Sequence, residues 1–280
     1  MAAIFRTFLG DREVRGVLPD DRGLAYGDGL FETMRGHAGR IPWWSAHWDR
    51  LARGAERLAI ALPARARVEA EVDRLLEGAD GVVKLRVGRT GGGRGYAPPA
   101  GGEPSWSLSL HAEPEPPRRG LVLRWCATPV SIQPALAGIK HCNRLEQVLA
   151  RLEWNQPGAA GADADEGLMC ATDGAVVGAT AANLFVLHGS RWQTPEVDRC
   201  GVAGVCRGWL LQHCEVDQAR ITVEEVERAD ALVLTNAVRG ILPVARLGRR
   251  NFVPHPAVAE WQRRLARSHP AFASTPSEMP

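Results

Sequence analysis

The sequence contains very few lysines. Of its 34 basic residues only Lys84 and Lys140 are lysine, and all the others are arginine. Arginine stays charged and cannot act as an amine nucleophile, whereas lysine can lose its proton and form a Schiff base. Lys84 lies beside Arg86 in the alternating stretch GVVKLRVGR, which predicts a half-exposed strand with a solvated lysine. Lys140 lies between Gly138 and a predicted helix, and its position alone leaves open whether it is a solvated charge or a reactive amine.

The sequence also lacks an excess of charge and any long apolar run. Its 34 basic and 32 acidic residues are well mixed and give a net charge of +2, so no nucleic-acid partner is expected. No stretch approaches the ~20 apolar residues that cross a bilayer, so no membrane association is expected. The first residues, MAAIFRTFLGDREVRG, do not resemble a signal peptide. We therefore expect a cytoplasmic protein.

Cysteine pairs typical of metal or redox sites are absent as well. None of the six cysteines forms a CxxC pair, and the histidines do not complete a zinc-like spacing. In a chain of 280 residues, this favours buried thiols in a reducing compartment over a disulfide scaffold. No metal site is expected.

The distribution of strands, helices and loops indicates an α+β protein with two domains. Short alternating stretches alternate with amphipathic ones, such as PWWSAHWDRLARGAERLAI at 42–60, where Ser45 is a plausible N-cap. Proline and charge concentrate around residues 114–120, which favours a linker there. We expect a small N-terminal domain at 1–113, a larger domain at 121–268 and a frayed tail at 269–280.

Two turns have the form of anion-binding turns, although each has a simpler explanation. GVAGVCR leads into a predicted helix, so the N–H groups of Val205 and Cys206 would point beyond its N-terminus. LTNAV places Thr235 and Asn236 at the end of an apolar strand. Most such turns are plain helix caps or strand ends, and either pattern alone is weak.

The loop TGGGRGY is rich in glycine and therefore costly to order. Either it is mobile, or its backbone approaches a ligand that Arg94 and Tyr96 contact. Arginine on such a loop suits a carboxylate, which it can bind through two parallel hydrogen bonds. GGGRG is not a dinucleotide fingerprint because no helix follows it.

Several pieces of the sequence, taken in their order, resemble the fold-type-IV pyridoxal-phosphate enzymes. This class includes branched-chain and D-amino acid transaminases and aminodeoxychorismate lyase, and LAGIKHCNRLEQ and GGRGY are most similar to the lyase. The resemblance covers nearly the whole chain up to about residue 245. The pieces are YGDGLFETMR, HWDRL, GGRGY, LAGIKHCNRLEQVLAR, DEGLMCATDGAVV, TAANLF and GVAGVCR.

The resemblance implies pyridoxal 5′-phosphate as the cofactor. Lys140 matches the lysine that forms the Schiff base with the cofactor and later moves the proton. Arg50 matches the arginine that binds the phosphate, together with the N–H groups of Val205 and Cys206. Asn236 matches a strand end beside that phosphate.

The same resemblance implies residues for the substrate and an architecture. Thr33 matches a threonine near the reactive lysine, and Arg94, with Tyr96 near it, would face a substrate carboxylate. The implied fold has a smaller N-terminal α/β domain and a larger C-terminal one with the cofactor between them, usually in a homodimer. The implied reaction converts 4-amino-4-deoxychorismate to 4-aminobenzoate and pyruvate, a step toward folate.

One position departs from the family pattern. Members commonly carry a glutamate that pairs with the pyridine nitrogen of the cofactor, and the matching position here is Gly178. Without that carboxylate the ring is a weaker electron sink. A lyase whose product becomes aromatic tolerates this better than a transaminase. A D-amino acid or branched-chain transaminase, and a degenerate homologue that acts through its dimer surface, remain the alternatives.

Overall fold

The chain folds into two compact units of mixed α and β structure. The computed structural model describes residues 4–17, 19–91, 95–115, 119–155 and 161–273. The first unit comprises Met1–Pro114 and Ile139–Asn143, and the second comprises Glu115–Gly138 and Arg144–Pro280. The linker predicted at 114–120 lies partly outside the described residues. The segment Ile139–Asn143, which the sequence predicts for the larger domain, is grouped with the first unit because it pairs with a strand there.

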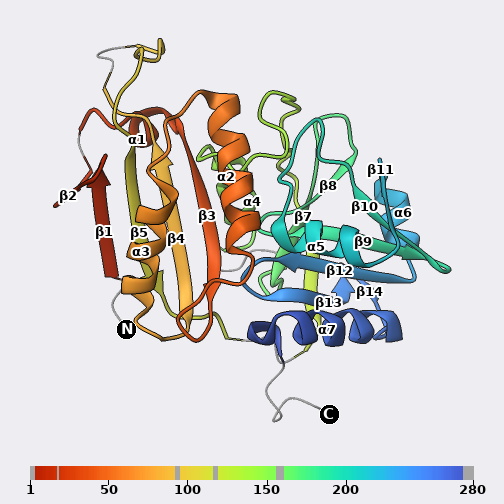
Figure 1. The fold of residues 1–280 in the computed structure, drawn as a ribbon. Helices are drawn as coiled ribbons and strands as arrows, with labels where there is room; N and C mark the ends of the chain where they lie inside the picture. The colour runs from red at the N-terminus through yellow and green to blue at the C-terminus, as the bar shows by residue number, and fades with distance from the viewer. Residues whose placement is uncertain (1–3, 18, 92–94, 116–118, 156–160, 274–280) are drawn as a thin grey trace. The chain divides into compact units, whose positions relative to one another are not determined.

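The first unit is built on a five-stranded sheet in which every neighbouring pair is antiparallel. The strand order is β2-β1-β5-β4-β3, which leaves β3 at one edge. Figure 1 shows helices α2 and α3 on one face of this sheet. The elements are β1 (Ile4–Leu9), β2 (Arg12–Val14), α1 (Arg22–Tyr26), β3 (Gly29–Gly36), α2 (Trp44–Leu58), α3 (Arg65–Leu76), β4 (Gly81–Gly88) and β5 (Ser105–His111).

Strand β3 alternates between a buried face and a half-buried face. Leu30, Glu32 and Met34 are buried, with at most 1% of their surface exposed. The residues between them are half-buried and point to the opposite face, because side chains alternate along a strand. Helix α2 comes very close to β3 at Gly54, where an added Cβ would lie 2.9 Å from Leu30. This close contact sets the distance between the helix and the buried face.

The predicted helix at 42–60 is present as α2, but its predicted cap is wrong. Trp43 is the N-cap residue and makes no side-chain capping bond, so Ser45 lies within the first turn. The Ser45 hydroxyl instead accepts a hydrogen bond from Arg65 Nη2 at 3.1 Å. The Ser45 hydroxyl, which the local pattern assigned to the cap of α2, therefore bonds a residue of α3 instead.

The second unit is built on a larger mixed sheet. Its strand order is β11-β10-β9-β12-β13-β6-β7-β8, and β14 pairs with β13. Parallel pairs join β13 to β6, β6 to β7 and β10 to β11, while the other neighbours are antiparallel. The elements are β6 (Leu121–Trp125), α4 (Leu145–Leu152), β7 (Glu166–Cys170), β8 (Val176–Ala179), β9 (Asn183–His188), β10 (Arg191–Pro195), α5 (Val205–His213), β11 (Val216–Ala219), α6 (Val223–Arg228), β12 (Ala231–Asn236), β13 (Gly240–Leu247), β14 (Arg250–Asn251), α7 (Pro256–Ser268) and the short 3₁₀ helix η1 (Pro270–Phe272).

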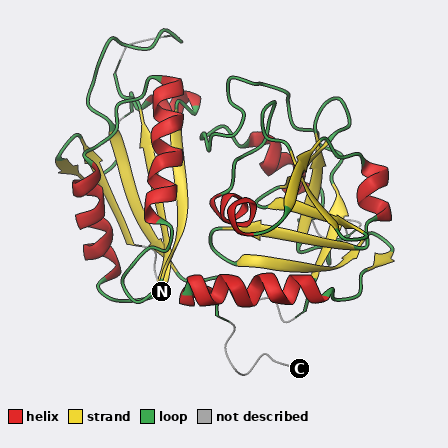
Figure 2. Cartoon of the chain, turned by 45° about the vertical axis from the view of Figure 1, so that its right-hand side comes forward, coloured by secondary structure: helices red, strands yellow, loops and turns green. Residues whose placement is uncertain are grey.

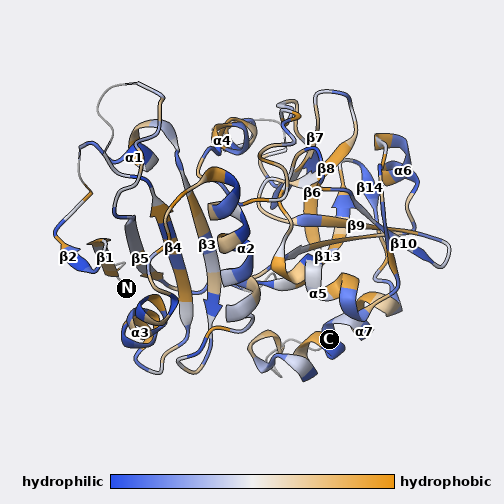
Figure 3. Ribbon diagram, turned by 45° about the horizontal axis from the view of Figure 1, so that its top comes forward, coloured by the Kyte–Doolittle hydropathy of each residue, from blue (hydrophilic) through white to orange (hydrophobic). Residues whose placement is uncertain are grey.

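Helix α7 lies along the strands of the second unit, at the bottom of the views in Figures 1 and 2. Figure 3 shows that it carries both hydrophilic and hydrophobic residues. Trp261 on its buried side packs against Phe185 and Trp192, with ring centroids 5.9 and 4.4 Å away. The opposite face of the sheet forms an apolar core, which includes Leu184 and Leu232. Strands β9 and β12 are thus covered on both faces.

The predicted tail at 269–280 is partly ordered. Residues Pro270–Phe272 form η1, and Ala271 is buried. A Cβ at Gly240 would lie 2.9 Å from the Phe272 ring, so this ring packs against the turn before β13. Residues 274–280 lie outside the described residues. No helix in the described part of the chain is both long and apolar enough to cross a membrane.

Candidate active site

Lys140 is held at the free edge of β3 by main-chain hydrogen bonds. The N–H of Phe31 donates to the carbonyl of Lys140 at 3.0 Å, and the N–H of Cys142 donates to the carbonyl of Gly29 at 2.8 Å. These bonds align the segment antiparallel to β3. A lysine anchored through its backbone in this way has a defined starting point for its side chain. The structure thus places Lys140 on an ordered element of the first unit.

Both lysines of the chain contact the same aromatic ring. The Nζ atoms of Lys140 and Lys84 lie 4.4 and 5.2 Å from the centroid of Phe31. Thr33 lies directly opposite Lys84 in the β3–β4 pair, and it shares the half-buried face of β3 with Phe31. We call Phe31, Thr33, Lys84 and Lys140 the lysine face. The expectation that Lys84 is a simple solvated lysine is incomplete, because it is exposed yet stacked over this ring.

Arg50 belongs to a buried charged group on the opposite face of β3. Its Nε donates to Glu32 Oε1 at 2.8 Å, and its Nη2 donates to Glu32 Oε2. The Nδ1 of His47 lies 2.6 Å from the same Oε2. We call Glu32, His47 and Arg50 the Arg50 triad. Their exposed fractions are 1%, 1% and 6%, so these charges are removed from water and compensate one another.

The electrostatics of the Arg50 triad follow from this pairing. Burial alone would raise the pKa of Glu32, but the charge of Arg50 and the hydrogen bond from His47 outweigh it and lower the pKa to about 2. Burial lowers the pKa of His47, and the carboxylate of Glu32 only partly opposes this shift. At neutral pH the triad therefore holds an ionised Glu32, a charged Arg50 and a neutral His47 that donates through Nδ1.

Sequence reasoning identified Arg50 but missed its two partners. Their signal was present: Glu32 alternates with Leu30 and Met34 on the inward side of β3. His47 and Arg50 are three residues apart and therefore share one face of α2. A polar residue at an inward strand position opposite a helix face with two cationic or imidazole groups predicts a buried polar cluster.

The glycine-rich loop is only partly described. Arg94, the residue predicted to face a substrate carboxylate, lies outside the described residues. The side chain of Tyr96 is 85% exposed, and its ring packs edge-on against Tyr26 at 5.5 Å. Arg22, which is buried, donates to the carbonyls of Gly95 and Tyr96, both at 2.9 Å. The end of the loop is therefore tied to α1 by its main chain.

The turn that the sequence predicts as an anion site lies at the start of α5 in the second unit. The N-cap residue is Gly204, which has no side chain to cap the N–H groups of Val205 and Cys206. A Cβ at Gly204 would lie 1.9 Å from Asn183 Oδ1, so this close approach requires glycine. Burial raises the pKa of the Cys206 thiol well above its usual range, so this thiol stays protonated at neutral pH.

Thr235 and Asn183 lie directly opposite each other on β12 and β9. The Thr235 hydroxyl is buried, and no hydrogen-bond partner for it exists in the described part of the chain. Such an orphan group usually marks a place for a missing partner. Asn236, the predicted phosphate neighbour, uses its Oδ1 to accept from the N–H groups of Val238 and Arg239 at 3.0 and 2.8 Å. The Asn236 side chain therefore closes the turn. The Thr235 hydroxyl is the polar group that has no hydrogen bond within the described residues.

Gly178 on β8 has a backbone conformation that suits glycine. Its φ is +146°, and an added Cβ would lie 3.1 Å from the carbonyl oxygen of Ala182. The pairing of β7 with β8 also shifts register beside it, between the pairs Met169–Gly178 and Cys170–Val176. A glutamate at this position would be strained. The backbone therefore disfavours the side chain that the family pattern has here.

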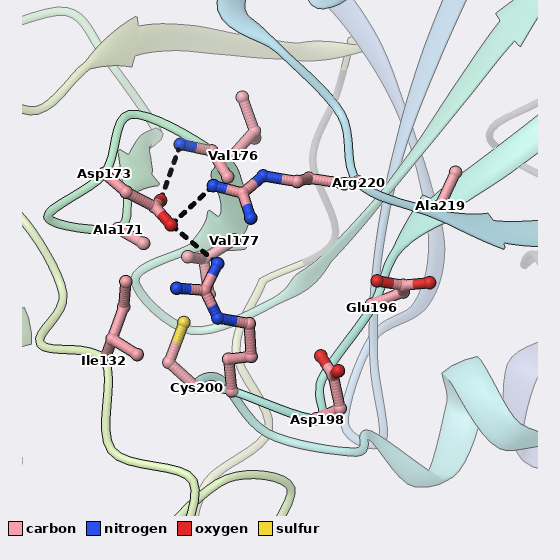
Figure 4. Close-up of a pocket in the computed structure, with 12 residues that line it drawn as sticks. Ile132, Ala171, Asp173, Val176, Val177, Glu196, Asp198, Cys200, Ala219 and Arg220 are labelled. Atoms are coloured by element: carbon pink, nitrogen blue, oxygen red, sulfur yellow. Dashed lines mark hydrogen bonds and ion pairs between the residues drawn. The ribbon is translucent and has the colours of Figure 1, made fainter.

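A separate small pocket of about 40 Å³ lies elsewhere in the second unit (Figure 4). Asp173 there forms ion pairs with Arg199 and Arg220, which neutralise one another at its rim. Its lining does not include Val205, Cys206 or Thr235. The predicted cofactor-binding residues of the second unit therefore do not line this pocket.

Comparison with known proteins identifies the family of the chain. Residues 29–247 match the family described as class IV amino-transferases. The chain belongs to this family. It is 32% identical over 235 residues to an aminodeoxychorismate lyase of Vibrio harveyi, covering 80% of this chain and 85% of the relative. It is 29% identical to a putative branched-chain-amino-acid aminotransferase of Methanocaldococcus jannaschii, covering 82% of each.

Among solved structures of the class IV amino-transferase family, the chain is similar to 4-amino-4-deoxychorismate lyase of Pseudomonas aeruginosa. The TM-score is 0.85 at 38% identity, and the alignment covers 94% of this chain and 99% of the other. A branched-chain aminotransferase of Thermoproteus uzoniensis has a TM-score of 0.80 at 18% identity, which supports the fold alone.

Each unit, taken by itself, offers groups that suit a part of pyridoxal phosphate. Lys140 offers an amine on an ordered edge, and Arg50 offers a buried cation. The orphaned hydroxyl of Thr235 and the uncapped start of α5 offer donors for an anion. Gly178, the position that the resemblance assigns to the ring nitrogen, has no side chain to pair with it.

Proposed function

We propose that this protein is a pyridoxal-phosphate-dependent lyase that converts 4-amino-4-deoxychorismate to 4-aminobenzoate and pyruvate. The observation that carries the proposal is the placement of Lys140. One of only two lysines is anchored at the edge of β3 over Phe31, in a chain 38% identical to a 4-amino-4-deoxychorismate lyase. This reaction is a step toward folate.

Two groups of residues are proposed to hold the cofactor. Lys140 would hold it covalently through Nζ. Arg50 would pair with its phosphate, and the N–H groups of Val205 and Cys206, with the Thr235 hydroxyl, would donate to phosphate oxygens. In this proposal Asn236 acts through the turn that it closes rather than by contact.

Pyridoxal phosphate, when bound, supplies the electron sink that lets a C–H bond next to the substrate amine break. Lys140 is proposed to accept that proton at Nζ, since a freed amine beside the reacting carbon is a general base. Phe31 stabilises the resulting ammonium through its ring face, 4.4 Å away. Thr33 is proposed to assist proton transfer from the same face of β3.

The substrate is an anion, and the first unit offers cations for it. Lys84 adds a positive charge to the lysine face, across the strand pair from Thr33. Arg94 is proposed to bind a substrate carboxylate, with Tyr96 beside it. The tie from Arg22 to the carbonyls of Gly95 and Tyr96 would limit how far this end of the loop can move.

Gly178 favours the lyase over a transaminase. A weaker electron sink suffices when the product gains an aromatic ring, because aromatisation supplies driving force. A transaminase has no such driving force and depends more on the sink. The backbone of Gly178 excludes the family's carboxylate at this position, which agrees with the lyase reaction.

We further propose a cytoplasmic homodimer. The six cysteines are all free, in keeping with a reducing compartment. The apolar face of α4 is exposed and is a candidate for part of a subunit interface.

The test of the lyase combines product release with a map of the cofactor lysine. Purified protein with pyridoxal phosphate and aminodeoxychorismate should release pyruvate and 4-aminobenzoate in equal amounts. Borohydride reduction followed by peptide mass spectrometry should place the cofactor on Lys140. Lys84→Ala should keep this adduct, whereas Lys140→Ala should lose it together with turnover. A 2-oxo acid formed from an amino acid, without pyruvate release from aminodeoxychorismate, would establish the transaminase instead.

A further inference from the structure

The Arg50 triad contains two residues for which no role has been assigned. Glu32 binds two nitrogens of Arg50, Nε and Nη2, through both of its carboxylate oxygens. His47 adds a third bond to the same carboxylate at 2.6 Å. All three side chains are buried: β3 supplies Glu32, and α2 supplies His47 and Arg50 from one face.

We propose that Glu32 and His47 are positioning residues that aim the Arg50 guanidinium at an anion, the cofactor phosphate. This inference rests on the proposed function for the identity of that anion. The paired bonds to Glu32 lie in the plane of the guanidinium and fix both its position and its rotation. A guanidinium held along one edge cannot rotate, so less conformational freedom is lost when an anion binds it.

His47 orients the carboxylate in turn. Because Glu32 is ionised, the proton lies on His47 Nδ1, which donates to Oε2. Its other nitrogen, Nε2, is buried and has no hydrogen-bond partner in the described ranges. A histidine kept only for packing would ordinarily satisfy both nitrogens. With the proton on Nδ1, Nε2 can only accept a hydrogen bond, so His47 acts on an anion through Glu32 and not by direct contact.

A purely structural ion cluster in the same unit provides the comparison. Glu71 is fully buried and pairs with Arg6, Arg67 and Arg74. Two of these arginines, Arg67 and Arg74, have exposed fractions of 38% and 58%, so this cluster opens to water. Glu71 is therefore a matched control: a buried glutamate with arginine partners that no part of the proposed site uses.

The experiment compares the binding of pyridoxal phosphate with that of pyridoxal, which has the aldehyde but no phosphate. Both can react with Lys140, so the ratio of their dissociation constants isolates the phosphate. Glu32→Gln and His47→Leu should each reduce this preference about tenfold. His47→Asn should retain most of the preference, because its amide can still donate to Glu32. Glu71→Gln should lower thermal stability and leave the ratio unchanged.

Arg50→Gln separates failure of this inference from failure of the proposed site. If Arg50→Gln keeps the preference for the phosphorylated form, Arg50 is not the anchor and the site assignment fails. If Arg50→Gln loses it while both Glu32→Gln and His47→Leu keep it, the positioning role alone is overturned. If Glu32→Gln does not fold, the contrast between His47→Leu and His47→Asn decides, and equal ratios for those two variants refute the role.

Discussion

At the scale of single residues, the site depends on polar groups whose partners are few and defined. Within the Arg50 triad, the buried charged groups pair almost entirely with one another. Thr235 is the opposite case, since its hydroxyl has no partner in the described part of the chain. A buried hydroxyl without a hydrogen bond destabilises a fold by about 1–3 kcal/mol.

Thr235→Val should therefore leave stability unchanged or raise it by up to about 1 kcal/mol, because it removes an unsatisfied group and keeps the shape. The same change should weaken pyridoxal phosphate about tenfold, since a hydrogen bond to a charged phosphate is lost. Denaturant unfolding and cofactor titration check the two effects, with Thr235→Ser as the variant that keeps the hydroxyl. Loss of stability with no change in affinity would show that the hydroxyl serves the fold.

Acid should weaken the fold through Glu32. Its pKa in the folded chain is about 2, below the usual value of 4.5, so the ionised form stabilises the fold above pH 4.5. That contribution, up to about 3 kcal/mol, is lost as the pH falls from 4.5 toward 2. Glu32→Gln should be less stable than the parent at pH 7, and the difference should shrink on acidification through this range. A difference that stays constant from pH 7 to 3 would argue against the pairing.

His47 should add a second change of stability with pH, at higher pH than that of Glu32. Burial lowers the pKa of His47, so a neutral His47 stabilises the fold above pH 6.5, and this contribution declines as the pH falls below 6.5. His47→Asn has no group to titrate and should lack this step. Stability measured across pH 7.5 to 5 provides the check.

At the scale of elements, strand edges and helix ends decide where chemistry can occur. The free edge of β3 accepts the segment with Lys140, and the first turn of α5 leaves its N–H groups uncapped. Strand β8 interrupts its ladder at Gly178. At each of these three places, backbone N–H or carbonyl groups that regular secondary structure would pair are left for other contacts.

The positive φ of Gly178 in β8 predicts that two glycine substitutions will have contrasting effects. Gly178→Ala should destabilise the protein by about 1–3 kcal/mol, because φ of +146° is unfavourable for alanine. Gly208, inside α5, has no neighbour within 4 Å of an added Cβ, and Gly208→Ala should stabilise by about 0.5–1 kcal/mol. Thermal unfolding of both variants checks the pair. Equal effects would show that the strand at Gly178 adapts to a side chain.

The elements were largely predictable, because their signals are local. The alternation of GVVKLRVGR predicted β4, and the apolar spacing of residues 42–60 predicted α2. The cap of α2 was not, since Ser45 is engaged by Arg65, twenty residues away. The grouping of Lys140 with the first unit also depends on a pairing between distant segments, and no local pattern reports that.

At the scale of the whole molecule, one surface of the second unit is unusual. Leu145, Val148, Leu149 and Leu152 of α4 are 75%, 50%, 54% and 47% exposed. Four neighbouring apolar side chains on one helix face are more than isolated exposed residues and indicate a contact surface. They are too few to form a stable interface alone, which buries roughly 1,200–2,000 Å².

We expect a dimer in light scattering, with Leu149→Glu shifting it toward the monomer, because a charge in an apolar interface is unfavourable. Val253→Glu is the matched control, since Val253 is 83% exposed but lies outside α4. The control should remain dimeric. A parent protein that is monomeric at micromolar concentration would contradict the proposed homodimer.

By itself, the sequence determined the family, and it predicted the reactive lysine and the missing carboxylate. Those conclusions need only residue identity in order along the chain, since a primary amine or an absent side chain can be recognised without coordinates. The tertiary structure alone decided that Glu32 and His47 hold Arg50, that Thr235 rather than Asn236 carries the unused group, and that both lysines meet at Phe31. These are properties of burial and of contacts between distant segments, and they exist only once β3, α2 and the Lys140 segment are packed together.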